Sequence, residues 1–283
     1  MKIGLCHEIC SDWPIQNVFA YAAALGCHGV EIAPWTLAGS LAELTPERRR
    51  EIRRAAETHG VEILGLHWLL VKPEGLSINH PDPDIRRRTQ EQMRGLIHLC
   101  ADLGGHILTH GSPGQRTVQP SWDVAESWRR ARETFEACLP TAEERGAVYC
   151  IEPLARVNTN FVNTVDEALR LVREIDHPCF QLMVDCRSAE AGDGGAVAAL
   201  RAALASGFLR HVHVNDVNGN GPGFGHVRFA PILQALIDAA YTGYVSVEVF
   251  TSEPDSRTIA ARSVGYLTGI LEALGHAPGA GVR

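Results

Sequence analysis

Short runs of apolar residues recur along the whole chain, and each is followed by a longer segment with helical character. The runs are four to seven residues long and are bounded by Gly, Pro, Asn or Asp. Such runs are typical of strands that are buried on both faces of a parallel sheet. They predict eight strands, at residues 2–7, 29–34, 62–67, 106–111, 147–153, 180–186, 209–215 and 244–250.

The segments between these runs carry the residues that begin and end helices. Several start after Asp or Thr or at Pro, and several stop at Gly, which commonly follows the last helical turn. They predict eight helices, at residues 14–25, 46–59, 85–103, 122–145, 165–175, 196–206, 230–240 and 257–274.

The alternation of strands and helices predicts the fold class. It implies a parallel sheet with right-handed crossovers. Eight units in 283 residues favour an α/β fold, a (β/α)8 TIM barrel, which typically needs about 250 residues. An open doubly wound sheet is the alternative, and the lack of GxGxxG after the first strand disfavours it. We expect a single catalytic domain at residues 1–275 and a short C-terminal tail at 276–283.

Composition and charge narrow the class of protein. The chain is 45% hydrophobic with a net charge of −7, which indicates a large core and argues against a nucleic-acid partner. It shows no signal-peptide pattern and no run approaching the roughly 18 apolar residues of a membrane helix. The eight cysteines are scattered without a CxxC pair, as expected of free thiols in a reducing compartment. These features predict a soluble, cytoplasmic protein without a membrane partner.

Four residues of types that bind metals stand at the ends of the last four predicted strands. They are separated by 33, 28 and 35 residues, and each interval is close to the roughly 30 residues of one strand–helix unit. Any one of them alone is more often a capping group, but four in register predict convergence at one mouth. Three carboxylates and one imidazole suit Mn²⁺, Mg²⁺ or Co²⁺, and Zn²⁺ is also compatible. The four residues are Glu152, Asp185, His213 and Glu248.

Four segments carry a resemblance to a known family. They are IEPLARVNTNFVNTVDEAL (151–169), QLMVDC (181–186), HVHVNDVNGNGPGFG (211–225) and YTGYVSVEVF (241–250). Nearly the whole chain resembles the xylose-isomerase-like TIM barrels, which include sugar isomerases and epimerases and the endonuclease IV type of abasic-site nuclease. The resemblance implies that the same four strand-end residues are metal ligands. Here His213 is preferred over His211 because it stands two residues before Asn215.

The chain departs from two branches of this family. Ketose 3-epimerases that it resembles usually carry a sugar-holding His where this chain has Ser188, and a sugar-holding Arg where it has Gly219. These departures leave the ketohexose substrate open while keeping the metal ligands. The nuclease branch has a further His after the sixth strand and a DRH triplet after the seventh, and both are missing. This argues against a complete three-metal centre.

Other residues near strand ends are candidates for binding the substrate. Two histidines end the third and fourth predicted strands, although a single histidine there is more often a core or capping residue. An arginine after the fourth strand would hold a carboxylate or hydroxyl, or else would be solvated in a turn. A tryptophan after the second strand would stack on a sugar or cap the barrel. With a weaker arginine candidate, the predicted set is His67, His110, Arg116, Trp35 and Arg156.

The predicted site suggests a mechanism of proton transfer. A metal that binds a carbonyl and a neighbouring hydroxyl would acidify the adjacent C–H bond. We expect Glu152 to remove that proton, which gives a metal-bound enediolate, and Glu248 to return a proton from the opposite face. Return to the other face of the carbon gives epimerisation, and return to the other carbon gives isomerisation. The sequence therefore predicts an isomerase or epimerase that acts on a sugar or a related polyhydroxylated keto compound.

Other functions remain open at this point. Loss of a β-hydroxyl at the same site would make the protein a dehydratase or lyase of the inosose or dehydroshikimate type. The second alternative is an endonuclease IV-like nuclease, and the third is a protein that binds sugar or metal without catalysis. The expected partner is a sugar-like small molecule, and the resemblance implies a homodimer or homotetramer.

Overall fold

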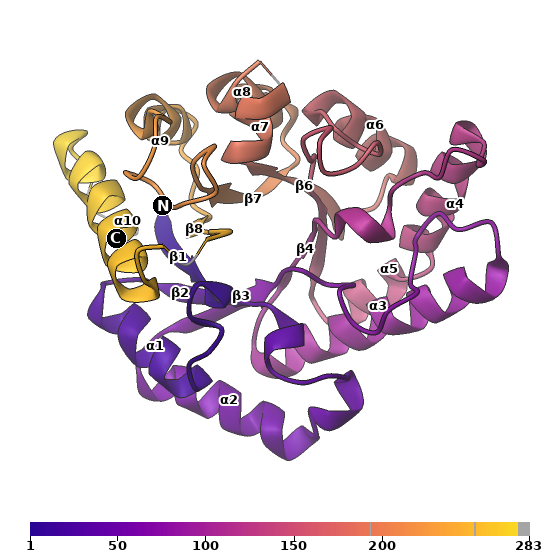
Figure 1. Ribbon diagram of the computed structural model, residues 1–283, viewed down its shortest axis with the longest axis horizontal. Coiled ribbons are helices and arrows are strands. Elements are labelled where there is room, and N and C mark those ends of the chain that lie inside the picture. Colours follow the sequence, from indigo (N-terminus) through magenta and orange to yellow (C-terminus); the bar gives the residue numbers. More distant parts are fainter. Residues whose placement is uncertain (193, 252, 277–283) are drawn as a thin grey trace.

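The strands of the protein close into a barrel. The computed structural model describes residues 1–192, 194–251 and 253–276, and the eight strands in this part form one closed barrel in sequence order (Figure 1). Each strand pairs in parallel with the next, and the last pairs with the first through Ile3 and Val245. The predicted TIM barrel is therefore confirmed. The strands are β1 (Lys2–Cys6), β2 (Gly29–Ile32), β3 (Glu62–Leu66), β4 (Ile107–His110), β5 (Val148–Ile151), β6 (Phe180–Asp185), β7 (Leu209–Val214) and β8 (Tyr244–Val247).

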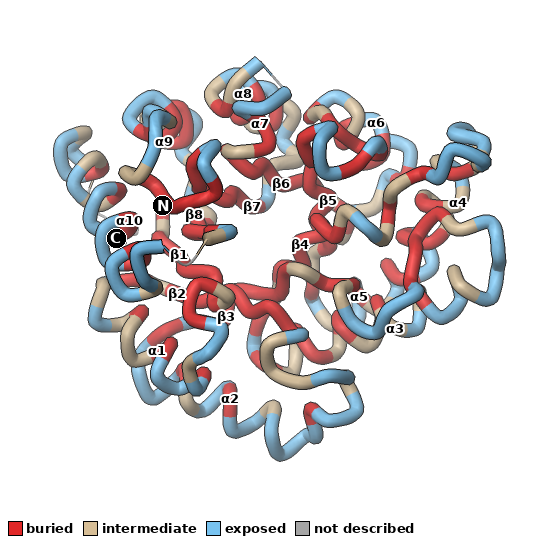
Figure 2. Tube along the Cα trace, in the orientation of Figure 1, coloured by how far each residue is buried: buried red, intermediate tan, exposed pale blue. Residues whose placement is uncertain are grey.

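Helices surround the barrel and bury one face against it. Figure 2 shows buried residues along the strands and exposed residues on the outer sides of the helices. The caps follow the sequence signals: Thr45 accepts a hydrogen bond from the Arg48 amide, and Gly104 ends its helix at a φ of 92°. The helices are α1 (Ile15–Ala24), α2 (Pro46–Thr58), α3 (Pro83–Leu103), α4 (Val124–Glu136), α5 (Leu139–Glu144), α6 (Val165–Ile175), α7 (Cys186–Gly192), α8 (Ala196–Ser206), α9 (Phe229–Asp238) and α10 (Ser256–Ala273).

Two helical regions differ from the prediction. The single helix expected at residues 122–145 is divided into α4 and α5. Pro140 explains the break because it has no backbone N–H to continue the α4 ladder, although it fits the first turn of a new helix. The short helix α7 follows β6 directly and was not predicted. This matters for function because α7 starts at the mouth of the barrel, immediately after Asp185.

Three further expectations concern membranes, thiols and the tail. In the part of the chain that the structure describes, no helix is long and apolar enough to cross a membrane. All eight cysteines are free thiols. The predicted tail, residues 276–283, lies outside the described residues from position 277 onward.

Candidate metal centre and substrate pocket

The four predicted metal ligands meet at the C-terminal mouth of the barrel. Glu152 and Glu248 directly follow β5 and β8, Asp185 ends β6, and His213 lies near the end of β7. Asp185 and His213 are paired in the β6–β7 register, which sets them at one level. One ligand atom from each of the four residues lies within 4.8 Å of those of the others, and all four side chains are buried. The structure therefore brings together the set that strand spacing predicted.

The electrostatics of this cluster suit a divalent cation. Burial, with the charges of Glu248 and Asp185, raises the pKa of Glu152 to about 8. Burial and Glu248 also raise the pKa of Asp185. Burial opposes ionisation of Glu248 too, but the imidazoles of His213 and His67 outweigh it and lower the pKa of Glu248 to about 2. Carboxylates this close together repel one another when they are all ionised, and a bound cation would relieve that repulsion. The residues present therefore fit a metal ion.

Neighbouring groups hold the oxygen atoms of the cluster in place. Asp185 Oδ1 accepts a hydrogen bond from the Ser188 amide at 2.7 Å, and Asp185 Oδ2 accepts one from Asn215 Nδ2 at 2.6 Å. Asn215 Nδ2 also lies 3.4 Å from Glu248 Oε2. One amide thus orients two carboxylates, as outer-shell groups do in metal sites.

A buried polar layer lies below the cluster and orients His213. Glu31 Oε2 lies 3.1 Å from His213 Nε2 and 2.8 Å from His211 Nε2, and Thr109 donates to Glu31 Oε1 at 3.1 Å. His213 Nδ1 faces the other way, 3.2 Å from Glu248 Oε2. A proton on Nε2 directed at Glu31 would leave Nδ1 free to bind a cation.

The strand register also distinguishes the two histidines of β7. His211 pairs with Met183, two residues deeper in the barrel than the pair of His213 with Asp185. His211 therefore belongs to the polar layer with Glu31, and His213 belongs to the mouth.

One functional neighbour was missed by sequence reasoning. Glu8 lies in the short helix η1 (His7–Cys10), and its Oε2 is 2.8 Å from His67 Nε2. His67 Nδ1 is in turn 3.4 Å from Glu248 Oε1. Both glutamates therefore flank one imidazole, and they raise the pKa of His67 to about 10 although burial alone would lower it. The available signal was that Glu8 follows the first strand, where it could reach the same mouth.

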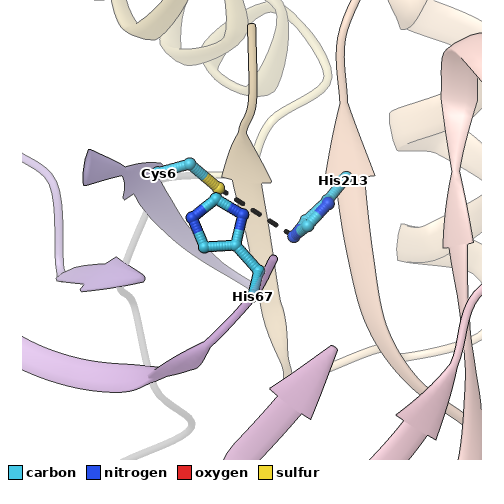
Figure 3. A group of neighbouring side chains, drawn as sticks. All are labelled: Cys6, His67 and His213. Atoms are coloured by element: carbon cyan, nitrogen blue, oxygen red, sulfur yellow. Dashed lines mark hydrogen bonds between the residues drawn. The ribbon is translucent and has the colours of Figure 1, made fainter. Parts of the chain in front are cut away.

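A cysteine also faces the centre but is not a ligand in its thiol form. Figure 3 shows Cys6, His67 and His213 turned toward one another, with Cys6 Sγ 3.9 Å from His213 Nε2. Burial, with the charge of Glu31, raises the pKa of Cys6 well above its usual value. Cys6, His67 and His213 form a further group that could hold a metal ion, and Cys6 would join it only after losing its proton, because metals bind the thiolate.

The cluster opens into a pocket at the mouth of the barrel. Two of its wall residues, Trp68 and Ser112, have the left-handed backbone conformation, with φ of 51° and 38°, that non-glycine residues seldom adopt and that recurs at functional sites. Residues that sequence reasoning missed follow strands β4, β5, β6 and β8 by one to seven positions. The lining residues are His67, Trp68, Gly111, Ser112, Pro113, Glu152, Leu154, Asn158, Arg187, Ser188, Glu248 and Phe250.

Three of the predicted substrate-binding residues lie in three different surroundings. His67 lines this pocket, whereas Trp35, in η2 (Pro34–Thr36), lines a neighbouring smaller cavity and is 40% exposed. His110 is buried, and its Nδ1 lies 2.9 Å from the Tyr149 hydroxyl. Their contacts with a substrate stay predictions.

Both predicted arginines lie away from the pocket lining. Arg116 is fully buried, and its guanidinium Nη1 donates to the His110 carbonyl at 3.5 Å. Its charge is close enough to act on Glu152. Arg156 is 73% exposed and lies 3.8 Å from Glu167 Oε1. A role for either in binding the substrate also stays a prediction.

Comparisons with known proteins agree with the geometry. The family described as xylose isomerase-like TIM barrel matches residues 19–270. The chain is similar to D-psicose 3-epimerase of Ruminiclostridium cellulolyticum, with 27% identity over 202 residues that cover 71% of this chain and 67% of that protein. It is also similar to fructoselysine 3-epimerase of Shigella flexneri, with 24% identity over 270 residues that cover 93% of this chain and 95% of that protein.

Solved structures share the fold. An L-ribulose 3-epimerase superposes with a TM-score of 0.83 and 20% identity, over 96% of this chain and 95% of that chain. A 3-keto-D-glucoside 4-epimerase from E. coli superposes with a TM-score of 0.81 and 22% identity, over 94% of this chain and 98% of that chain.

Proposed function

Because the chain belongs to the xylose isomerase-like TIM barrel family, we propose that it is a divalent-metal-dependent isomerase or epimerase of a sugar or a related polyhydroxylated keto compound. The observation that carries this proposal is the pair of buried glutamates, Glu152 and Glu248, which line one pocket and form, with Asp185 and His213, a group that could hold a metal ion. Two carboxylates at one pocket can act in turn as general base and general acid. The names of the relatives favour epimerisation of a ketose.

The metal would be held by Glu152, Asp185, His213 and Glu248. Mostly oxygen donors favour Mn²⁺, Mg²⁺ or Co²⁺, and Zn²⁺ remains compatible. When bound, the ion would polarise a carbonyl group of the substrate and so acidify the neighbouring C–H bond.

The chain's own residues would move the proton. Glu152 removes it from the carbon beside the carbonyl, and Glu248 returns one from the opposite face. Since epimerisation is reversible, the two glutamates exchange these roles when the reaction runs in the other direction. His67, held between Glu8 and Glu248, fixes the Glu248 carboxylate while the proton moves. The aromatic wall of Trp68 and Phe250 would exclude water from the pocket.

A solvent-exchange experiment tests the proposal directly. The protein is stripped with EDTA, reloaded separately with Mn²⁺, Mg²⁺, Co²⁺ or Zn²⁺, and incubated in D₂O with a panel of ketoses, inososes and 3-keto sugars. We expect deuterium to appear next to the carbonyl, by NMR, only in the reloaded protein. Tight metal binding without exchange in any compound would contradict the proposal and favour a binding protein.

The same experiment separates the alternatives. Loss of a β-hydroxyl, seen as a dehydrated product, would assign the site to a lyase of the inosose or dehydroshikimate type. A parallel incubation with an abasic DNA duplex tests the nuclease alternative, and we expect no strand cleavage because a chain with net charge −7 disfavours a polyanion.

We also infer a reducing, cytoplasmic compartment, since the eight cysteines are all free thiols. Assembly as a homodimer or homotetramer remains a prediction from the family resemblance, and light scattering of the purified protein tests it.

A further inference from the structure

One cation in the pocket wall, Arg187, has no counter-charge among the residues that the structure describes. Arg187 is half-buried in the first turn of α7 and lines the pocket next to Ser188. Among the described residues, no carboxylate lies within ion-pair distance of its guanidinium, and its buried Nε has no hydrogen-bond partner. By contrast, the other cationic wall residue, His67, has Glu8 and Glu248 on either side.

Neighbouring residues hold both the backbone and the side chain of Arg187. Its backbone amide donates to Asn215 Oδ1 at 2.9 Å, and Asn215 also holds the Asp185 carboxylate. Its guanidinium carbon lies 4.9 Å from the centre of the Phe250 ring, and Phe250 packs edge-on against Trp68. The guanidinium is therefore held at a defined place relative to the metal cluster.

From this arrangement, and resting on the proposed function, we infer that the substrate carries an anionic group, a carboxylate or a phosphate, that pairs with Arg187. A guanidinium has five donors and no acceptor, and its fork of N–H groups matches two oxygens of an anion. A partly desolvated charge without a counter-charge is costly, and an anionic substrate would supply one. The neutral hydroxyls of a sugar both donate and accept hydrogen bonds, and Ser112, Asn158 and Ser188 in the same wall offer groups that can bind them.

The test uses four ketoses with the same configuration at their stereocentres. They are D-fructose, 2-keto-D-gluconate with a carboxylate at C1, D-fructuronate with a carboxylate at C6, and D-fructose 6-phosphate. Binding to the Mn²⁺-loaded protein is measured by calorimetry, and deuterium exchange is scored on the same samples. We expect at least one anionic compound to bind about tenfold or more tighter than D-fructose, and the compound that does so identifies the group and its position.

Variants of the arginine decide whether the charge is responsible. In Arg187→Gln we expect the anionic preference to be lost, about 10- to 100-fold, while D-fructose binding changes less than about threefold. Arg187→Lys should retain part of the preference, and the control Arg201→Gln, an exposed arginine on α8, should retain all of it. Circular dichroism and Tm confirm that each variant folds.

Two results would overturn the inference: equal binding of all four compounds by the unaltered protein, or an equal loss of neutral and anionic binding in Arg187→Gln. Failure of the proposed function is separate, because it would appear as an anionic binding preference without exchange in any compound. Exchange of D-fructose without an anionic preference would keep the proposed function and reject the role of Arg187.

Discussion

The two halves of the barrel mouth differ in what they contribute. The half formed by β5–β8 supplies all four residues of the candidate metal centre. The half formed by β1–β4 supplies Glu31, which contacts His213, and His67, which contacts Glu248. The β5–β8 half thus carries the metal ligands and also Asn215, which orients Asp185 and Glu248, whereas the β1–β4 half adds groups that contact His213 and Glu248.

The comparison shows how a closed barrel divides the work of a site. Glu31 and His213 are 182 residues apart in the chain, yet their side chains meet inside the barrel at 3.1 Å. Outer-shell groups of this kind fix the tautomer and direction of a ligand. The β1–β4 half is therefore as necessary for the geometry of the centre as the half that holds the donors.

The largest expected effect on activity comes from a change in the β5–β8 half, which holds the candidate metal ligands. Glu152→Gln removes the proton acceptor while keeping nearly the same shape and hydrogen-bonding capacity. We expect deuterium exchange to fall by about 10³-fold or more, within the range that general bases contribute, and the fold to be retained. The measurement is exchange by NMR together with circular dichroism. Near-normal exchange would reject Glu152 as a base, and Glu136→Gln, at the exposed end of α4, is the matched control.

The next largest effect is expected from a residue of the β1–β4 half that contacts a metal ligand of the β5–β8 half. Glu31→Gln removes the charge that two buried imidazoles share, so we expect Mn²⁺ affinity to fall about 10- to 100-fold. Loss of one partner of a buried pair should also cost about 3–5 kcal/mol of unfolding free energy. Metal titration and urea unfolding measure the two effects. Thr109→Val, which removes only the hydroxyl donor to Glu31, should change both less. Unchanged metal affinity in Glu31→Gln would mean that the two halves act independently.

A smaller, pH-dependent effect is expected within the β1–β4 half. Burial, with the charge of Arg116, lowers the pKa of His110 to about 3, whereas an unfolded histidine titrates near 6.5. The unfolded chain therefore binds more protons between these values, and stability is lost as pH falls through this window. Relative to His110→Gln, the unaltered protein should lose about 2 kcal/mol between pH 6.5 and pH 5, at about 1.36 kcal/mol per pH unit.

Urea unfolding of both proteins in metal-free buffer measures this difference, and the exposed His59→Gln provides the control. Parallel stability curves would show that His110 is not buried in its neutral form. A large increase in KM in His110→Gln, with little change in stability, would instead support the predicted contact with substrate.

The smallest effect is expected in the loop after β5. Arg156→Ala removes a side chain that is 73% exposed, with its nearest carboxylate oxygen at 3.8 Å. We expect a stability change within about 0.5 kcal/mol and a KM change within about twofold. A tenfold rise in KM would indicate that this loop closes over the substrate. The contribution of the β5–β8 half would then include the loop as well as the metal ligands.

Local sequence determined much of the fold and part of the site. Apolar runs of regular spacing predicted the eight strands, and the same spacing brought Glu152, Asp185, His213 and Glu248 to one depth. Pro140 could have predicted the break between α4 and α5, because its missing N–H is a local property. Such features depend on residues within one strand–helix unit and are therefore readable along the chain.

Tertiary structure decided which distant side chains meet. The β6–β7 register separated His213 at the mouth from His211 below it, and closure of β8 onto β1 brought Glu248 beside His67. Within the described ranges, it also left Arg187 without a carboxylate partner, although acidic residues are numerous in the chain. The physical reason is that periodicity specifies which face a residue occupies, whereas contacts across a barrel depend on register and closure, which arise only when all eight strands pack together.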